Sequence, residues 1–333
     1  MAFLPFFFNN SLSRILKGKL DMSSPLLTVV VVTLNAQNRI PPLLEALTKQ
    51  TIAGELEVLI VNIASAEPQF VFPTGFDVAL VDQKNVRNLG QARAEGVRRA
   101  HSHYIAFLED HTIPDPRWAE AVYKAFCDAP GIDAVSYAFV NGSPDTYFYR
   151  SVFMAEYGAL AHPLREGLSP ALAANNVAYR REALLTVGEA LDGLIEVDYF
   201  LQKALGSSFR TTTAPQALLA HQTNTYLGDL LRGHFVYAQL FAVRRLQFEN
   251  WNLPKRLAGA AAVPVLVPLL RIKRLFQAVG GRSNTSRAIA ALPVILLLYL
   301  AGALGEAWGL LHRQSDLAET LIWLELESER ISG

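Results

Sequence analysis

The sequence is short of charge and of cysteine. Charged side chains make up 18% of its 333 residues, against about 25% in an average soluble domain, while hydrophobic residues make up 51%. Part of the chain is therefore expected to meet a membrane. The 30 basic residues balance the 30 acidic ones, which excludes a general nucleic-acid binder with its basic excess. The single cysteine, Cys127, excludes a disulfide framework and a cysteine-ligated zinc site.

Two glycine-rich phosphate loops are missing as well. The sequence contains neither Gly-x-Gly-x-x-Gly nor Gly-x-x-x-x-Gly-Lys, so the dehydrogenase and ATPase classes lack the loops that hold their phosphates. A nucleotidyltransferase would normally show a glycine-rich loop bearing Lys or Arg after its first strand. Residues 35–39, which follow the first expected strand, contain no glycine.

Apolar runs rich in β-branched residues alternate with helical patterns in the first part of the chain. Strands are expected at residues 26–34, 58–61, 78–81 and 104–108, a polar turn at 35–39, and helices from Pro41-Pro42 onward and at 90–100. Strands and helices that alternate at this spacing predict a doubly wound α/β fold with a mostly parallel sheet. Ligands of such folds bind at the carboxyl ends of the strands, so the residues just after each strand are the candidates for chemistry.

The C-terminal third contains two uncharged segments. Residues 257–270 make a stretch of 14 with two prolines, and residues 288–305 make a stretch of 18 that continues in apolar residues beyond Glu306. A membrane-spanning helix needs about 20 apolar residues, so the second segment is expected to span and the first to lie at the interface. The connection at 271–287 is basic and free of acids, which predicts the cytoplasmic side. A buried core helix is the alternative for the second segment.

Four short motifs follow one another along the chain. They are Val31-Val32-Thr33-Leu34-Asn35, then Asn88 with Gly90 and Ala92-Arg93, then Phe107-Leu108-Glu109-Asp110-His111, and last Asp198 with Leu201. On these motifs the chain resembles the family 2 glycosyltransferases over residues 26–221. The resemblance implies the GT-A fold, with its Rossmann-like sheet, and an inverting transfer of a sugar from a nucleotide-sugar donor to an acceptor hydroxyl.

The family's metal-binding Asp-x-Asp pair corresponds to Glu109 and His111. Alternate residues of a strand share a face, so these two side chains are expected to point together and Asp110 elsewhere. Carboxylates suit Mg²⁺ or Mn²⁺, and an imidazole shifts the preference towards Mn²⁺ and later metals. A polar strand end without a metal is the alternative. His221 follows an apolar stretch. It is either a contact to the metal or the diphosphate from late in the domain, or a structural histidine.

The resemblance places the general base at Asp198, at the start of an expected helix. In an inverting transfer such a carboxylate removes the proton of the acceptor hydroxyl as its oxygen attacks the anomeric carbon. The family's Glu-Asp pair is Val197-Asp198 here, with Glu196 displaced by one position, so Glu196 is a rival base. For both acids the alternative is a favourable interaction with the dipole at a helix N-terminus.

Five residues are implied as nucleotide contacts. They are Thr33 and Asn35 at the position of the base, Asn62 after the second strand, and Asn88 and Arg93 from the second motif. Asn62 stands where the family commonly has the aspartate that reads uracil. An amide carries both a donor and an acceptor and can still pair with a base edge, but the substitution leaves the base of the donor open.

These observations divide the chain into five expected parts. They are an N-terminal amphipathic or interfacial segment (1–24), a GT-A domain (25–225), a connecting helical region (226–256), membrane-associated helices (257–312) and an acidic C-terminal tail (313–333). The sequence predicts a glycosyltransferase at the cytoplasmic face of the inner membrane, with a divalent metal and a sugar or lipid-linked acceptor of a surface-polysaccharide pathway. Two alternatives stay open: a catalytically silent GT-A-fold membrane scaffold, which the altered metal motif favours, and a nucleotidyltransferase.

Overall fold

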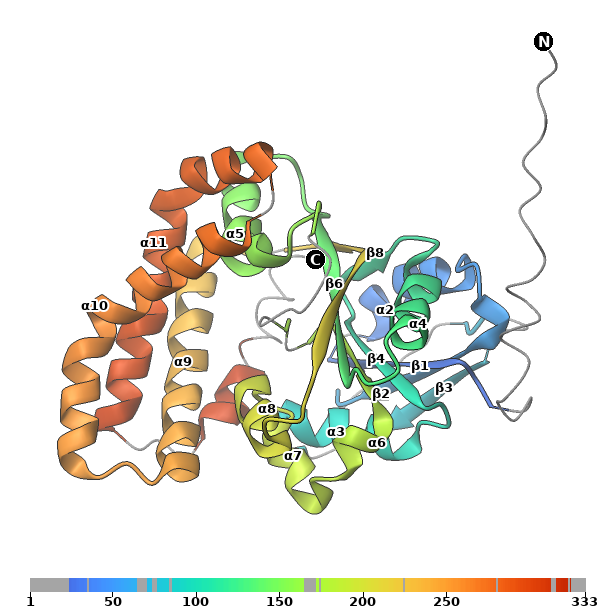
Figure 1. The fold of residues 1–333 in the computed structure, drawn as a ribbon, viewed down its shortest axis with the longest axis horizontal. Helices are drawn as coiled ribbons and strands as arrows, with labels where there is room; N and C mark the ends of the chain where they lie inside the picture. The colour runs from blue at the N-terminus through green and yellow to red at the C-terminus, as the bar shows by residue number, and fades with distance from the viewer. Residues whose placement is uncertain are drawn as a thin grey trace, which may run out of the picture.

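The computed structural model describes residues 24–34, 36–64, 71–73, 77–83, 86–164, 172–173, 175–223, 225–279, 281–312, 316–322 and 324. Residues 1–23, Asn35 and much of the acidic tail lie outside the described residues, so what was expected of them stays a prediction. The strands are β1 (Leu27–Thr33), β2 (Leu56–Asn62), β3 (Asp77–Asp82), β4 (Tyr104–Glu109), β5 (Thr112–Pro114), β6 (Ala134–Asn141), β7 (Val177–Arg180) and β8 (Thr211–His221) (Figure 1). The helices are α2 (Ala36–Thr48), α3 (Leu89–Arg99), α4 (Trp118–Asp128), α5 (Tyr147–Tyr157), α6 (Arg181–Leu185), α7 (Leu191–Leu194), α8 (Asp198–Leu205), α9 (Leu227–Glu249), α10 (Leu253–Ala278) and α11 (Gly281–Leu311).

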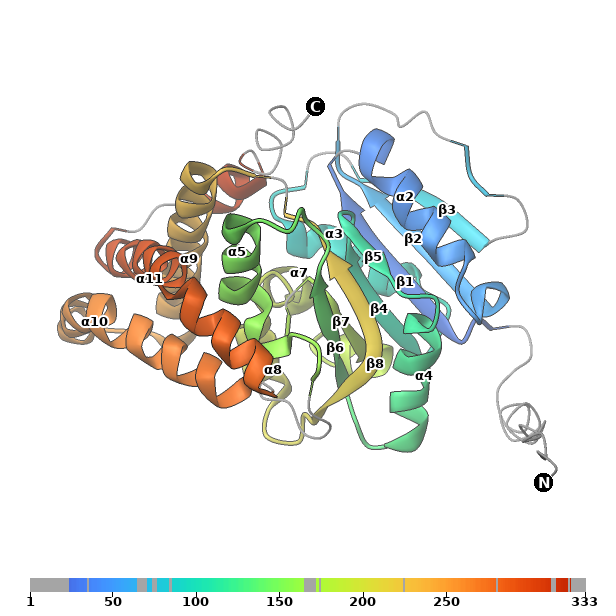
Figure 2. The same cartoon turned by 90° about the horizontal axis from the view of Figure 1, so that it is seen from above.

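Within the described residues, the strands form one mixed sheet in the order β3-β2-β1-β4-β7-β6-β8-β5, seen from above in Figure 2. β3, β2, β1 and β4 are parallel neighbours, which confirms the α/β class, and β7 runs antiparallel to both β4 and β6. α2 and α4 cover one face of the sheet, and α3 and α7 cover the other. β1 is buried almost throughout, as its run of valines predicts for a strand between two helical layers.

The prediction of a polar turn at residues 35–39 is wrong, because α2 begins at Ala36 and contains Pro41 and Pro42. The first four N–H groups of a helix have no partner within the helix. Pro41 and Pro42 lie beyond these four positions, so each removes one hydrogen bond of the second turn while the first turn still forms ahead of them. The earlier start puts Arg39 on a helix at the carboxyl edge of the sheet.

The start of α3 is held tightly against α7. Asn88 caps the helix, with its side-chain oxygen accepting a hydrogen bond from the Gln91 N–H at 2.9 Å. A Cβ atom at Gly90 would lie 2.3 Å from the carbonyl oxygen of Asp192, so only glycine allows this approach. The contact brings α3 beside the segment that carries the two candidate bases.

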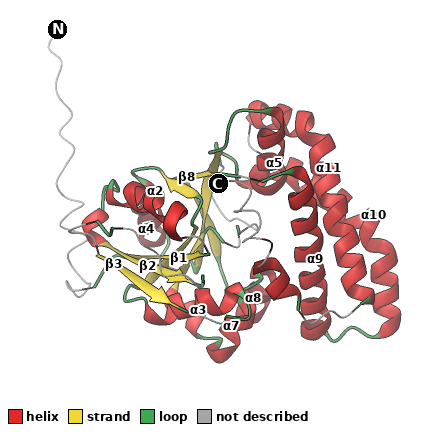
Figure 3. Cartoon of the chain, turned by 180° about the vertical axis from the view of Figure 1, so that it is seen from behind, coloured by secondary structure: helices red, strands yellow, loops and turns green. Residues whose placement is uncertain are grey.

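α9, α10 and α11 form a helical layer beside the sheet, and α11 packs along both α9 and α5 (Figures 1 and 3). A Cβ atom at Gly305 would lie 2.0 Å from the carbonyl oxygen of Phe235, so glycine permits this close helix crossing. Arg245 of α9 donates to Glu306 of α11 at 2.6 Å. One hydrophobic core contains side chains of the sheet, of α10 and of α11. The C-terminal helices are therefore continuous with the α/β part rather than tethered to it.

Two segments of the described chain are long and apolar enough to cross a membrane, Leu253–Ala278 and Ser283–Leu311. Only 11% of the apolar window is buried in the first segment and 50% in the second, because α11 turns one side to α9 and α5. The large exposed apolar side chains on these helices are Leu253, Leu257, Val265, Leu266, Leu269, Leu270, Ile289, Leu296, Leu297, Leu300, Leu304, Trp308 and Leu311. An exposed apolar surface of this extent is typical of a membrane or protein interaction site.

Candidate functional site

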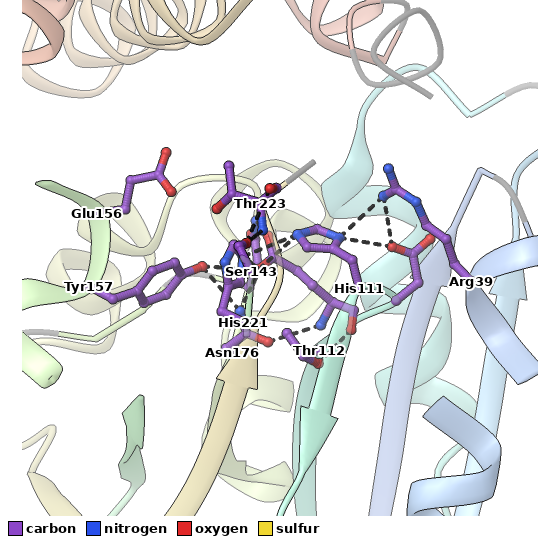
Figure 4. Close-up of polar contacts among 12 residues, drawn as sticks. Arg39, His111, Thr112, Ser143, Glu156, Tyr157, Asn176, His221 and Thr223 are labelled. Atoms are coloured by element: carbon purple, nitrogen blue, oxygen red, sulfur yellow. Dashed lines mark hydrogen bonds and ion pairs between the residues drawn. The ribbon is translucent and has the colours of Figure 1, made fainter. Parts of the chain in front are cut away.

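Three side chains that can ligate a metal meet at the carboxyl edge of the sheet (Figure 4). Glu109 ends β4, His111 lies in the turn between β4 and β5, and His221 ends β8, where it pairs with Thr112 of β5. Glu109 Oε2 lies 3.2 Å from His221 Nε2 and 3.8 Å from His111 Nε2. All three ligand atoms lie within 4.8 Å of one another. Glu109 and His111 thus point together, as the strand alternation predicted, and His221 joins them.

The Glu109 carboxylate is fixed by neutral donors. Asn175 Nδ2 donates to Oε1 at 2.6 Å, and both Asn176 Nδ2 and the Tyr157 hydroxyl donate to Oε2. Burial by itself would raise the pKa of Glu109, but the positive charge of His111 and the hydrogen bond from His221 hold it well below its usual range. Glu109 is therefore an ionised carboxylate in a fixed orientation, as a metal ligand must be.

Asp110 turns away from the cluster and orients His111. Its Oδ1 lies 3.0 Å from His111 Nδ1 and accepts from Arg39 at 3.1 Å, while Oδ2 accepts from the Thr33 hydroxyl at 2.6 Å. Burial alone would lower the pKa of His111, but the hydrogen bond to Asp110 and the charge of Glu109 raise it to about 9. A carboxylate on Nδ1 directs Nε2 towards the cluster, which is the usual arrangement behind a histidine ligand.

His221 supplies the third donor, 110 positions after His111 along the chain. Its ring lies against that of Tyr157, with centroids 4.4 Å apart, and it is nearly perpendicular to that of His111. His221 Nδ1 is buried and lacks a hydrogen-bond partner among the described residues. One carboxylate and two imidazoles form a donor set that fits a divalent transition metal such as Mn²⁺.

The cluster stands at one end of a cavity of about 690 Å³ between the sheet and the helices α5, α9, α10 and α11. Another part of the lining comes from the helical layer and includes Tyr237, Arg271, Arg274, Leu275 and Tyr299. The described lining residues do not include Arg93, Glu196 or Asp198. The metal-ligating end and the helical end therefore belong to one continuous space.

The two candidate bases differ in their partners. Asp198 is buried, with Oδ1 accepting from the Tyr179 hydroxyl at 3.1 Å and Oδ2 without a partner among the described residues. Burial raises the pKa of Asp198 to about 6, against the opposing charge of Arg93. Glu196 Oε2 accepts from Arg244 at 2.7 Å, and burial raises the pKa of Glu196 although Arg244 opposes the shift. Glu196 is therefore held in an ion pair with an arginine, whereas Asp198 forms no ion pair with any described residue.

Comparison with known proteins assigns the family. The model of the Glycosyl transferase family 2 matches residues 28–188. Residues 28–188 therefore belong to a family 2 glycosyltransferase domain. An uncharacterized glycosyltransferase of Haemophilus influenzae is 28% identical over 111 residues, which are 33% of this chain and 37% of that protein. The match thus spans little more than a third of the length of this curated relative.

A solved structure extends the likeness to nearly the whole chain. Mannosyltransferase PcManGT from Pyrobaculum calidifontis, solved in complex with GDP-Man and Mn²⁺, matches with a TM-score of 0.52 at 20% identity. The match covers 89% of this chain and 92% of PcManGT. The likeness shows the shared fold, and the expectation of a GT-A glycosyltransferase domain followed by apolar helices is confirmed.

In this glycosyltransferase domain the residues expected to contact the nucleotide bond to protein partners. Arg93 donates to the Ile195 carbonyl at 3.3 Å and to the Asn175 side chain, so it supports an amide that holds Glu109. Asn62 Nδ2 donates to Asp82 at 3.0 Å. Asn88 caps α3, and Thr33 donates to Asp110, as described above. Their nucleotide contacts, like that of Asn35, stay predictions.

Three contributors to the glycosyltransferase site were missed from the sequence. The Asn175-Asn176 doublet stands before a strand, and its position was a visible signal without an assigned role. Arg39 was assigned to the expected turn rather than to α2, because the helix begins earlier than the sequence predicts. Tyr157 carries no local signal, since α5 brings it to Glu109 from 48 residues away.

Proposed function

We propose that the protein is an inverting glycosyltransferase that moves a sugar from a nucleotide-sugar donor to an acceptor hydroxyl. The acceptor would be lipid-linked or part of a surface-polysaccharide precursor. The observation that carries this proposal is the cluster of Glu109, His111 and His221, which opens into a large cavity at the carboxyl edge of a family 2 domain. Ligands of α/β sheets bind at this edge.

Glu109, His111 and His221 would hold a divalent metal, Mn²⁺ or Mg²⁺, with Mn²⁺ favoured by the two imidazoles. The presence of GDP-Man and Mn²⁺ in the PcManGT structure supports this choice. Bound there, the metal would neutralise the charge that develops on the leaving diphosphate. Asp110 keeps the His111 ring oriented, and Asn176 and Tyr157 keep Glu109 in place, so the ligand set is organised before any donor arrives.

Asp198 is proposed as the general base. Its buried Oδ2 is free to accept a proton, and a pKa of about 6 leaves it ionised at neutral pH while still basic enough to act. Asp198 does not line the cavity itself, but it lies close enough to Tyr237, a lining residue, to influence the pKa of that phenol. Glu196 is a poorer candidate, since its charge is paired with Arg244, which bonds to Oε2.

The exposed apolar faces of α10 and α11 are proposed to attach the enzyme to the cytoplasmic side of the inner membrane. The stretch 271–287, which joins the two apolar segments, carries basic residues and no acid. Such a stretch stays on the cytoplasmic side by the positive-inside rule. The catalytic cavity, which α10 and α11 help to line, would then open beside the lipid headgroups.

A panel of nucleoside diphosphates and nucleotide-sugars, each with and without Mn²⁺, tests the function. We expect one diphosphate to raise the melting temperature only with Mn²⁺, and the matching nucleotide-sugar to be hydrolysed slowly without an acceptor. Binding without any turnover of any donor would indicate the silent scaffold. Release of inorganic diphosphate from a nucleoside triphosphate would indicate a nucleotidyltransferase instead.

A further inference from the structure

Most arginines of the helical layer already have acceptors. Arg244 pairs with Glu196, Arg245 pairs with Glu306, and Arg256 donates to the carbonyl groups at the end of α11. These cations are occupied in holding the layer against the glycosyltransferase domain. They are therefore poor candidates for binding an external anion.

Arg271 and Arg274 differ from these arginines. Both stand one turn apart on α10 and line the cavity. In the described part of the chain, neither guanidinium has a carboxylate within 4.0 Å or a hydrogen-bond acceptor; Arg271 lies over the Tyr299 ring, 5.5 Å from its centroid. Each side chain keeps a planar fork of N–H donors, and this geometry matches phosphate oxygens.

The other charged groups of the cavity do not neutralise this pair. Arg39 is bound to Asp110, and His234 Nε2 lies 3.5 Å from Glu156. Asp229 also lines the cavity, but it is not within ion-pair distance of Arg271 or Arg274. Among the described residues, the helical layer thus contributes two positive charges without an ion-pair partner to the cavity, and the edge of the sheet contributes the metal ligands.

Apolar surface surrounds the two arginines. Leu275 lines the cavity next to Arg274, together with Leu230, Leu321 and Leu324. The side chains that precede Arg271 on α10, Leu269 and Leu270, are exposed large apolar groups. A ligand that contacts both the arginines and this apolar surface has a phosphate group next to an apolar chain.

We propose that Arg271 and Arg274 bind the phosphate of an anionic amphiphilic acceptor, whose apolar chain lies along α10 and whose sugar points towards the metal-ligating end of the cavity. The acceptor phosphate serves as an anchor and takes no part in the bond changes. This proposal rests on the proposed glycosyltransferase function, because it names the acceptor class of that cavity. It requires both arginines and the apolar wall beside them.

Octyl phosphate is a suitable probe because it carries both features and stays monomeric at useful concentrations. Calorimetry on the full chain would compare octyl phosphate, octanol and inorganic phosphate. We expect octyl phosphate to bind more tightly than either. R271Q and R274Q should each weaken octyl phosphate binding by about tenfold or more, because each removes a charge-assisted hydrogen bond. K273Q is the matched control, since Lys273 is exposed on the same helix turn but does not line the cavity.

Three results would overturn the inference. R271Q and R274Q could bind octyl phosphate as tightly as the wild-type protein. K273Q could weaken binding as much as R271Q and R274Q do, which would show that binding depends on general surface charge. Inorganic phosphate could bind as tightly as octyl phosphate with the same arginine dependence. That result would show that the apolar chain adds nothing and that the site binds free phosphate.

Nucleotide binding with Mn²⁺, measured on the same variants, separates this inference from the proposed function. We expect R271Q and R274Q to leave it unchanged. Weakened nucleotide binding with intact octyl phosphate binding would assign the arginines to the donor and overturn the inference alone. A wild-type protein that binds no nucleotide but shows arginine-dependent octyl phosphate binding would overturn the proposed function and leave the phosphate site standing.

Discussion

The Nε2 atoms of His111 and His221 lie 3.1 Å apart, although 110 positions separate the two residues along the chain. The pairing of β5 with β8 creates this contact, because Thr112, next to His111, pairs directly with His221. Glu109 Oε2 lies 3.2 Å from the His221 nitrogen, so a carboxylate faces both rings. The site thus depends on a strand pairing that closes one edge of the sheet.

The first prediction concerns His221 as a metal ligand. His221→Ala should weaken Mn²⁺ binding by more than about tenfold, because loss of a ligand must cost at least as much as loss of the groups that support one. Electron paramagnetic resonance of free Mn²⁺ gives the affinity directly. His103→Ala is the matched control, since His103 is an exposed histidine at the start of β4, far from the carboxyl edge. Equal affinities in H221A and H103A would show that His221 is a structural histidine.

The second prediction is that metal binding releases a proton and strengthens as the pH rises. The pKa of His111 is raised to about 9, so His111 is charged at neutral pH and must lose a proton to ligate a metal. Mn²⁺ affinity should therefore rise between pH 6 and pH 9. Calorimetry in two buffers of different ionisation enthalpy measures the released proton. An affinity that does not change with pH, or no buffer dependence, would contradict the assignment of His111.

The third prediction concerns Asp198 in transfer. Asp198→Asn should lower the transfer rate by about 10²–10⁴-fold and leave Mn²⁺-dependent nucleotide affinity unchanged, because the amide keeps the shape but cannot take a proton. In the wild-type protein the rate should rise as the pH rises through about 6, the pKa of this buried carboxyl. Near-normal turnover of D198N would identify another group as the base.

Asp198 also predicts a pH dependence of stability. Its pKa in the folded protein lies above its value of about 3.9 in an unfolded chain, so folding favours the protonated form. The contribution of Asp198 to the free energy of unfolding is therefore complete below about pH 4 and is lost as the pH rises through 6. Melting temperatures of D198N and wild type should shift in favour of D198N between pH 4 and pH 7. A constant difference across this range would show that the pKa is not raised.

The fourth prediction separates Glu196 from the chemistry. Glu196→Gln removes the charge that pairs with Arg244, and the partly buried guanidinium left behind should lower the free energy of unfolding by about 1–3 kcal/mol. Transfer per folded molecule should stay close to the wild-type rate. Glu95→Gln is the control, because the Glu95–Arg99 pair is an exposed pair within α3 and should change stability by less than about 1 kcal/mol. A transfer defect in E196Q as large as that of D198N would make Glu196 the base.

The fifth prediction tests membrane attachment through α10. A double variant, Leu266→Gln with Leu269→Gln, should float less with lipid vesicles, because both side chains are exposed on the apolar face. Val71→Gln is the control, since Val71 is 92% exposed and lies in the glycosyltransferase domain. Truncation after Pro254 is a weaker test, because α11 supplies residues to the shared core. Unchanged flotation of the double variant would place the attachment elsewhere.

Local patterns determined much of the fold. The apolar runs at 26–34 and 104–108 predicted β1 and β4 almost to the residue, because a strand buried on both faces leaves a continuous hydrophobic signature. The pair Glu109 and His111 could also be predicted, since strand alternation fixes which neighbours share a face. The start of α2 could not, because proline is common at the first position of a helix, whereas Pro41 and Pro42 are the sixth and seventh residues of α2.

Only the tertiary structure decided the remainder of the site. His221 and Tyr157 reach Glu109 through strand pairing and helix packing; the sequence left His221 open between a ligand and a structural histidine and gave no signal for Tyr157. The different fates of Asp198 and Glu196 likewise depend on Arg244, which arrives on α9 from 48 residues away. Periodicity and motif spacing report only on neighbours along the chain. The packing of strand and helix faces against one another decides which distant side chains meet. Local sequence therefore determined the strands, helices and motifs, and the tertiary structure determined which side chains contact one another in the site.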